Sequence, residues 1–133
     1  MAENGLQSRS YVHAASILLL AALFIVAGIN HFLNPAFYVN IMPPYLPWAS
    51  LLVFVSGVFE IIGGVGVAVP ILRRAAGWGL IALLVAVFPA NIHMAIYPED
   101  FVEVPTWLLW LRLPLQFVLI VWVWWTTIHK AGA

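Results

Sequence analysis

Four long stretches of the chain are almost entirely apolar, and this pattern constrains the fold more than any other feature. They run over Tyr11–His31, Trp48–Val69, Ala75–Tyr97 and Thr106–Thr127. A helix needs about 20 apolar residues to cross the hydrocarbon core of a bilayer, because each residue rises about 1.5 Å. Each stretch is long enough to cross. The sequence therefore predicts an all-α integral membrane protein built as a four-helix bundle.

The composition supports the same class. Hydrophobic residues make up 65% of the 133 residues and charged residues only 8%, whereas soluble globular domains carry roughly 25% charged residues. Four spanning helices leave little chain over, so residues 1–133 are expected to form a single membrane domain. The formal net charge is +0 and no basic run occurs. We therefore expect the lipid bilayer, and no nucleic acid, as a partner.

The chain contains no cysteine. This excludes disulfides, thiol relays, cysteine-ligated iron–sulfur clusters and covalently attached c-type haem on this chain. The histidines also lack the spacing of a zinc site or of a bis-histidine haem site. We expect no metal, and any redox role has to use a cofactor, such as a quinone, or a partner protein.

Charged residues at the helix ends predict the topology. The basic residues that flank the four stretches all fall on one side of the membrane: Arg9, Arg73, Arg74 and Lys130. The loops on the opposite side carry no lysine or arginine, and they hold Glu99, Asp100 and Glu103. By the positive-inside rule, both termini are expected in the cytoplasm and the acidic loop outside it.

Glu60 is the only charged residue in the stretch Leu51–Val69. An acid at membrane depth is costly, so it marks a functional site by default. A helix that begins at Trp48 carries Glu60 about 18 Å along its axis, near the bilayer midplane. Ser56 and Gly64 lie one turn away on the same helical face, and small residues mark close helix contacts in membranes. Glu60 is therefore predicted to point into the bundle.

The other strongly polar intramembrane residues belong to the outer half of the predicted bundle. Arg112 lies about 10 Å down its helix from Pro105, and Gln116 lies one turn deeper on the same face. Asn91 belongs to the third stretch, and His31 ends the first. These positions predict a polar pocket that opens outward. Its candidate ligand-binding residues, of which Glu60 and His31 are also the candidate catalytic residues, are Glu60, Arg112, Asn91, His31, Gln116 and Ser56.

The sequence leaves the partner of Glu60 open. Arg112 is the only cation at comparable depth, and a bidentate guanidinium can satisfy a carboxylate where water is scarce. Such a pair could equally serve only to lock two helices together. Alternatively, a neutral Glu60 bonds to His31 or Asn91, because burial disfavours charged groups.

A segment rich in proline and aromatic residues connects the first two stretches. It reads FLNPAFYVNIMPPYLP from Phe32 to Pro47, and its prolines restrict the backbone. The apolar side chains predict a short helix or an extended lid on the outer interface. There it would cover the mouth of the polar pocket.

Three strings carry a further signal: AGINHFLNPAFYVNIMPPYLP, SGVFEIIGGVGVAVP and RRAAGWGLIALLVAVFPANIHMA. From about Ala27 to Ala95 they resemble the DoxX-like family of small four-helix bacterial membrane proteins. The resemblance implies a multi-pass protein of the bacterial cytoplasmic (inner) membrane. The family is similar to the membrane subunit of thiosulfate:quinone oxidoreductase, some members are associated with oxidative-stress and thiol-redox complexes, and distant relatives look like chaperones for membrane-protein assembly. The lack of cysteine argues against direct sulfur transfer by this chain.

Two functions fit these observations. In the first, the pocket binds a quinone headgroup or another small molecule, Glu60 and His31 exchange protons, and Arg112 and Asn91 orient an oxygen. The protein is then an accessory or quinone-facing subunit of a membrane redox system, with other membrane or periplasmic redox proteins as partners. In the second, it is a non-catalytic assembly factor, chaperone or interaction factor. A small-solute carrier is less supported, because the inner half offers no polar path.

Overall fold

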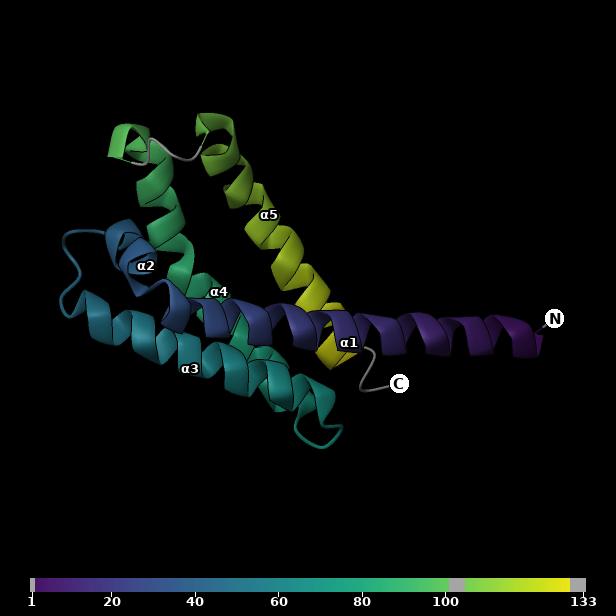
Figure 1. The fold of residues 1–133 in the computed structure, drawn as a ribbon. Helices are drawn as coiled ribbons and strands as arrows, with labels where there is room; N and C mark the ends of the chain where they lie inside the picture. The colour runs from purple at the N-terminus through teal and green to yellow at the C-terminus, as the bar shows by residue number, and fades with distance from the viewer. Residues whose placement is uncertain (1, 101–104, 130–133) are drawn as a thin grey trace.

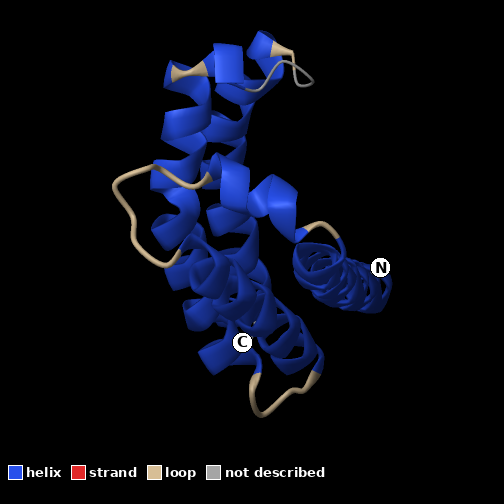
Figure 2. Cartoon of the chain, turned by 60° about the vertical axis from the view of Figure 1, so that its left-hand side comes forward, coloured by secondary structure: helices blue, strands red, loops and turns tan. Residues whose placement is uncertain are grey.

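The computed structural model describes residues 2–100 and 105–129, and its four long helices are those predicted from hydropathy. They are α1 (Ala2–Leu33), α3 (Ala49–Ala68), α4 (Arg73–Ile96) and α5 (Thr106–Trp124), and α5 continues as the π-helix η2 (Trp125–His129). In the described part of the chain all regular structure is helical (Figure 2). Each long helix contains a stretch that is long and apolar enough to cross a membrane.

The helix α1 begins before the predicted membrane stretch. It starts at Ala2, whereas its apolar part covers Ser10–Leu33. Figure 1 shows its N-terminal part extending beyond the other helices. Glu103 and Lys130, which contribute to the charge asymmetry that predicts the topology, lie outside the described residues.

The proline-rich segment forms a short helix, as predicted. This helix, α2 (Pro35–Ile41), begins with Pro35 in its first turn, where the missing N–H group of proline costs no hydrogen bond. A shorter 3-10 helix, η1 (Pro98–Asp100), connects α4 to α5. We call the end of the molecule that carries α2 and η1 the outer end, and the end that carries the α3–α4 turn and η2 the inner end (Figure 1).

Glycines bring α1 and α3 into close contact. A Cβ atom added at Gly28 would lie 2.8 Å from the backbone oxygen of Gly57, and one added at Gly64 would lie 2.9 Å from the backbone oxygen of Ala21. Backbone atoms cannot swing aside as side chains do. Small residues at these positions therefore set the short distance between the two helices, in line with membrane helix packing in general.

The helices α4 and α5 form a second pair that meets α1 and α3 at the inner end. A core of buried apolar side chains lies at this junction: Leu20, Ala21, Phe24, Val67, Leu80, Leu84 and Val123. Toward the outer end the two pairs separate, so that α1 and α3 lie on one side and α4 and α5 on the other (Figure 1). The fold thus has a packed inner end and a divided outer end.

A buried polar cluster lies at the inner end and was not predicted from the sequence, which placed the strongly polar intramembrane residues in the outer half. Ser16 Oγ lies 2.7 Å from Thr126 Oγ1 and accepts a hydrogen bond of 2.8 Å from Trp122 Nε1. His13 Nε2 lies 2.9 Å from the backbone oxygen of Thr126. Hydroxyl groups can be satisfied by neighbouring helices, so they do not interrupt an apolar stretch. Here they fasten α1 to the end of α5.

Candidate functional site

A cavity of about 310 Å³ lies between the two helix pairs in the outer half of the molecule. All six predicted ligand-binding residues line it: His31, Ser56, Glu60, Asn91, Arg112 and Gln116. They come from α1, α3, α4 and α5, so the fold brings together side chains that are up to 85 positions apart in the sequence. The volume falls at the lower end of small-molecule sites, which span about 300–1,000 Å³.

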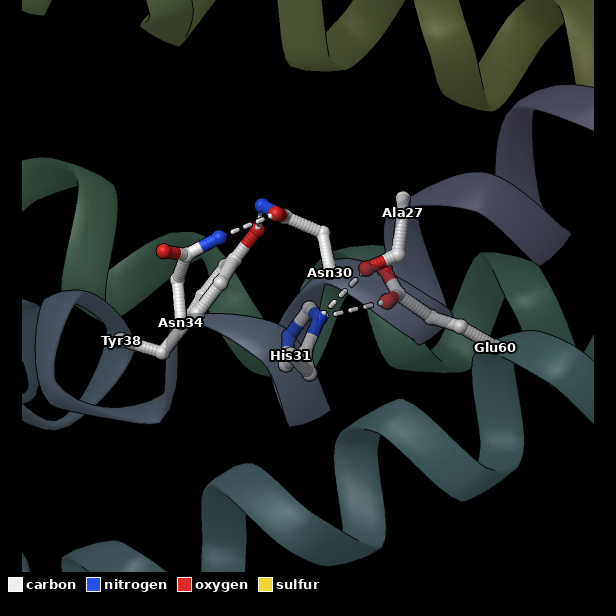
Figure 3. A network of polar contacts seen from close by, with 6 residues as sticks. All are labelled: Ala27, Asn30, His31, Asn34, Tyr38 and Glu60. Atoms are coloured by element: carbon white, nitrogen blue, oxygen red, sulfur yellow. Dashed lines mark hydrogen bonds and ion pairs between the residues drawn. The ribbon is translucent and has the colours of Figure 1, made fainter.

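His31 lies beside the carboxylate of Glu60. Its Nδ1 atom is 3.1 Å from Glu60 Oε2 and 2.8 Å from the backbone oxygen of Ala27 (Figure 3). A ring nitrogen carries at most one hydrogen, and the shorter contact, to Ala27, uses it in a hydrogen bond. Glu60 Oε2 is buried next to this imidazole, and it therefore has no hydrogen bond to any described residue.

This contact distinguishes among the three predicted partners of Glu60, which are Arg112, His31 and Asn91. Across residues 2–100 and 105–129 the ion pair found within 4.0 Å is that of Glu60 with His31. The predicted pairing of Glu60 with Arg112 is therefore absent, and Glu60 lies against His31 instead, in contact but without a hydrogen bond. The physical reason is the close packing of α1 on α3, which carries His31 to Glu60, while α5 lies on the far side of the cavity.

Arg112 faces the same cavity from α5 without a counter-charge. Among the described residues, no carboxylate lies within 4.0 Å of its guanidinium group, and this group forms no hydrogen bond. Leu115 and Leu119 line the cavity beside it. Guanidinium donors that face an apolar cavity are costly unless an acceptor reaches them. Arg112 is therefore the described side chain best placed to receive an oxygen atom from a ligand.

Asn91 and Gln116 form a polar link between α4 and α5. The Asn91 side-chain amide donates a hydrogen bond to Gln116 Oε1, and Gln116 Nε2 donates one to the backbone oxygen of Leu84. Gln116 is thus engaged within the protein, whereas Asn91 keeps its oxygen available beside the cavity.

Tyr38 belongs to the site, although the sequence analysis did not single it out. Its ring stacks on the His31 ring, with centroids 3.9 Å apart and planes inclined by 17°. Its hydroxyl oxygen accepts a hydrogen bond of 2.5 Å from Asn30 Nδ2, and Asn34 Nδ2 donates to Asn30 Oδ1 at 2.7 Å (Figure 3). The signal in the sequence that could have indicated this role is a polar aromatic residue one turn after Pro35. Tyr38 holds α2 over the cavity.

The chemistry of the site follows from these positions. One wall carries a carboxyl group and an imidazole, which can accept or release protons, and the opposite wall carries a guanidinium donor. Apolar side chains such as Val53, Leu84 and Val87 line the cavity between the polar groups. In the described part of the chain no three His, Asp or Glu side chains gather as metal ligands would.

Comparison with known proteins identifies the family of the chain. The chain belongs to the family described as a domain of unknown function (DUF8561), whose family model matches residues 20–127. The matched region contains all six predicted pocket residues and the whole of α2. No curated protein and no solved structure matches the chain. The DoxX-like resemblance stays a prediction.

Proposed function

We propose that this member of the DUF8561 family is a quinone-binding accessory subunit of a membrane redox system. In this proposal the chain is a multi-pass protein of the bacterial cytoplasmic membrane with both termini in the cytoplasm, so the outer end faces the periplasm. The observation that carries the proposal is the cavity between Arg112 and the His31–Glu60 pair. The DoxX-like resemblance, with its quinone-linked relatives, points to the same chemistry.

A quinone headgroup fits the polar groups of the cavity. It is a flat ring with carbonyl oxygens on opposite sides, so one oxygen can accept from Arg112 while the other approaches His31. Tyr38, already stacked on His31, offers an aromatic neighbour, and offset stacking between rings is favourable by about 0.5–1.5 kcal/mol. The apolar side chains of the walls suit the ring faces. A charged or strongly hydrated ligand would lose its water against these apolar walls without gaining hydrogen bonds in return.

The proposal assigns the transfer of one proton to this chain and electron transfer to a partner. Reduction of a quinone to a quinol takes two electrons and two protons, one at each oxygen. Glu60 and His31 can exchange one proton with the carbonyl oxygen that approaches His31, and the second proton, at the oxygen beside Arg112, comes from the partner with the electrons. The chain has no cysteine with which to pass electrons. Electrons therefore come from a membrane or periplasmic redox protein that docks on this subunit.

A non-catalytic assembly or interaction factor is the second candidate. The observation in its favour is that most of the polar groups also join helices: His31–Glu60 connects α1 to α3, and Asn91–Gln116 connects α4 to α5. Under this alternative the polar residues only hold the fold together. Arg112 separates the two candidates, because it lines the cavity without joining any described helix by an ion pair or hydrogen bond.

Thermal unfolding in detergent tests the proposal. Ubiquinone and menaquinone analogues are added to the wild type, to Arg112→Gln and to Arg74→Gln, which removes an exposed arginine outside the cavity. A ligand at 100 times its Kd stabilises the folded state by about 2.7 kcal/mol. We expect one of the analogues to raise the midpoint of the wild type and of Arg74→Gln, and to lose at least tenfold in affinity for Arg112→Gln. Absence of any shift in the wild type would overturn the proposal.

A further inference from the structure

The helices α1 and α5 are joined at the inner end. The polar contacts between α1 and the α5–η2 helix in the described chain are those of Ser16 with Trp122 and Thr126, and of His13 with Thr126. Just outward of them, Leu20 and Phe24 share one core with Val123. Beyond this point the two helices diverge (Figure 1). Their facing residues are then Ala27 and His31 on one side and Arg112 and Leu115 on the other, and these residues line the cavity.

Leu115, on the α5 side, marks a point where the cavity reaches the surface. Leu115 lines it and is nevertheless 48% exposed, so the cavity and the outside of the molecule meet at this side chain. Leu115 lies about 14 Å along α5 from Thr106, at a rise of about 1.5 Å per residue. The hydrocarbon core of a bilayer is about 30 Å thick. An opening at Leu115 therefore faces lipid tails instead of the aqueous phase.

The outer end of the cavity is covered by α2. Tyr38 and Met42 line the cavity from this side. Tyr38 also packs against the buried side chains of Met94 and Leu109, which belong to α4 and α5. With its hydroxyl group bonded to Asn30, Tyr38 is fixed to three helices. The outer side of the cavity is thus covered by Tyr38, whereas the α5 side carries the half-exposed Leu115.

We propose that the gap between α1 and α5, bordered by Ala27, Leu115 and Leu119, is a lateral portal to the bilayer. Through it the cavity admits the headgroup of an amphiphilic ligand and leaves the ligand's long apolar tail in the lipid. This inference rests on the proposed function and narrows its ligand class to tailed molecules that dissolve in the membrane. A tailless, water-soluble molecule of the same headgroup chemistry is excluded as the natural ligand, because its entry would require α2 to move away.

Spin labels at single cysteines test the portal, and the lack of native cysteine makes the labelling specific. Labels are placed at Leu115→Cys and Leu119→Cys, both cavity-lining, and at Val118→Cys as the control. Val118 is on the same helix and 61% exposed, and it does not line the cavity. Collisions of each label with oxygen, which dissolves in lipid, and with a water-soluble nickel chelate are measured in lipid nanodiscs. Decylubiquinone and its tailless headgroup analogue serve as ligands.

The portal predicts that the Leu115 label collides mainly with oxygen, as the Val118 label does. Decylubiquinone should lower the oxygen collisions at Leu115 at least twofold and leave Val118 unchanged, and the tailless analogue should change neither. Dominant collisions of the Leu115 and Leu119 labels with the nickel chelate would overturn the portal. The portal would also be overturned if decylubiquinone raised the thermal midpoint without changing the collisions at these labels. The proposal of quinone binding would still stand in that case. If no quinone shifts the midpoint, the proposed function fails, and collisions of the two labels without ligand still decide whether the opening faces lipid.

Discussion

His31 Nδ1 on α1 lies 3.1 Å from Glu60 Oε2 on α3, at the level of the cavity. Because the same nitrogen also donates to Ala27 within its own helix, the imidazole is held in place without Glu60. The acid is thereby kept beside a polar group but free of a strong hydrogen bond. This arrangement leaves the carboxyl group able to exchange a proton with a ligand in the cavity. It also predicts that the contact between Glu60 and His31 contributes only modestly to the stability of the fold.

We therefore expect Glu60→Gln to fold almost normally. The substitution keeps the shape of the side chain, and His31 keeps Ala27 as its acceptor, so the free energy of unfolding should change by no more than about 1 kcal/mol. Reversible unfolding in mixed micelles measures this change, with Glu99→Gln, an exposed acid outside the cavity, as the matched control. A loss above about 3 kcal/mol would instead show that Glu60 mainly locks α1 to α3.

Close packing of α1 on α3 predicts a strong effect of Gly28→Ala. The added Cβ atom would lie 2.7 Å from Ile61 Cγ1 and 2.8 Å from the backbone oxygen of Gly57, so the helices have to move apart. We expect a loss of about 1–3 kcal/mol in the free energy of unfolding, as for other overpacked positions. Thermal and denaturant unfolding of the purified protein measure it.

The control for this substitution is Gly79→Ala on α4, where an added Cβ atom meets nothing within 4 Å. Alanine is favoured over glycine inside a helix by roughly 0.5–1 kcal/mol, so this variant should be as stable as the wild type or slightly more stable. Equal losses for the two variants would contradict the role given to Gly28.

The link from Asn91 through Gln116 to Leu84 predicts a graded response along the link. Gln116→Leu removes both hydrogen bonds and leaves two polar groups unpaired in an apolar setting, which should cost about 1–3 kcal/mol of unfolding free energy. Asn91→Leu removes only the bond to Gln116 Oε1 and keeps the bond from Gln116 Nε2 to Leu84, so its loss should be smaller. Measured unfolding energies in the reverse order would show that the link is not the stabilising feature.

The proposed topology has a separate test. A reporter enzyme that is active only in the periplasm should be inactive when it is fused after Ala133, and active when it is inserted next to Glu99 in the loop between α4 and α5. A reporter that is active only in the cytoplasm should give the opposite pattern. Periplasmic activity after Ala133 would reverse the orientation and place the α2 end of the cavity in the cytoplasm.

Hydropathy and helical periodicity were enough to predict the helices and the direction of Glu60. Membrane-spanning length depends only on the local run of apolar residues, and the side on which Glu60 lies follows from the small residues one turn away. The six predicted pocket residues line one cavity for the same reason, since inward faces of helices in a small bundle have to meet. These inferences needed no knowledge of how the helices cross.

The partner of Glu60 and the role of Tyr38 could not be predicted in this way. Whether His31 or Arg112 reaches Glu60 depends on the splay of α5 away from α1, and splay leaves no periodic signature in the sequence. The place of Tyr38 depends on how α2 folds back over the cavity. The cluster of Ser16 with Thr126 was missed because hydroxyl groups hardly lower the hydropathy of a stretch.

Photoaffinity labelling with an azidoquinone tests the central claim most directly. The wild type in lipid nanodiscs is irradiated with the probe, and the modified residues are identified by mass spectrometry. We predict modification of cavity-lining residues such as Tyr38, Met42 and Leu115, suppressed by excess unlabelled quinone and lost in Arg112→Gln but kept in Arg74→Gln. Modification confined to exposed residues outside the cavity, such as Phe59 and Ile62, or labelling that excess quinone does not suppress, would contradict a quinone site in this cavity.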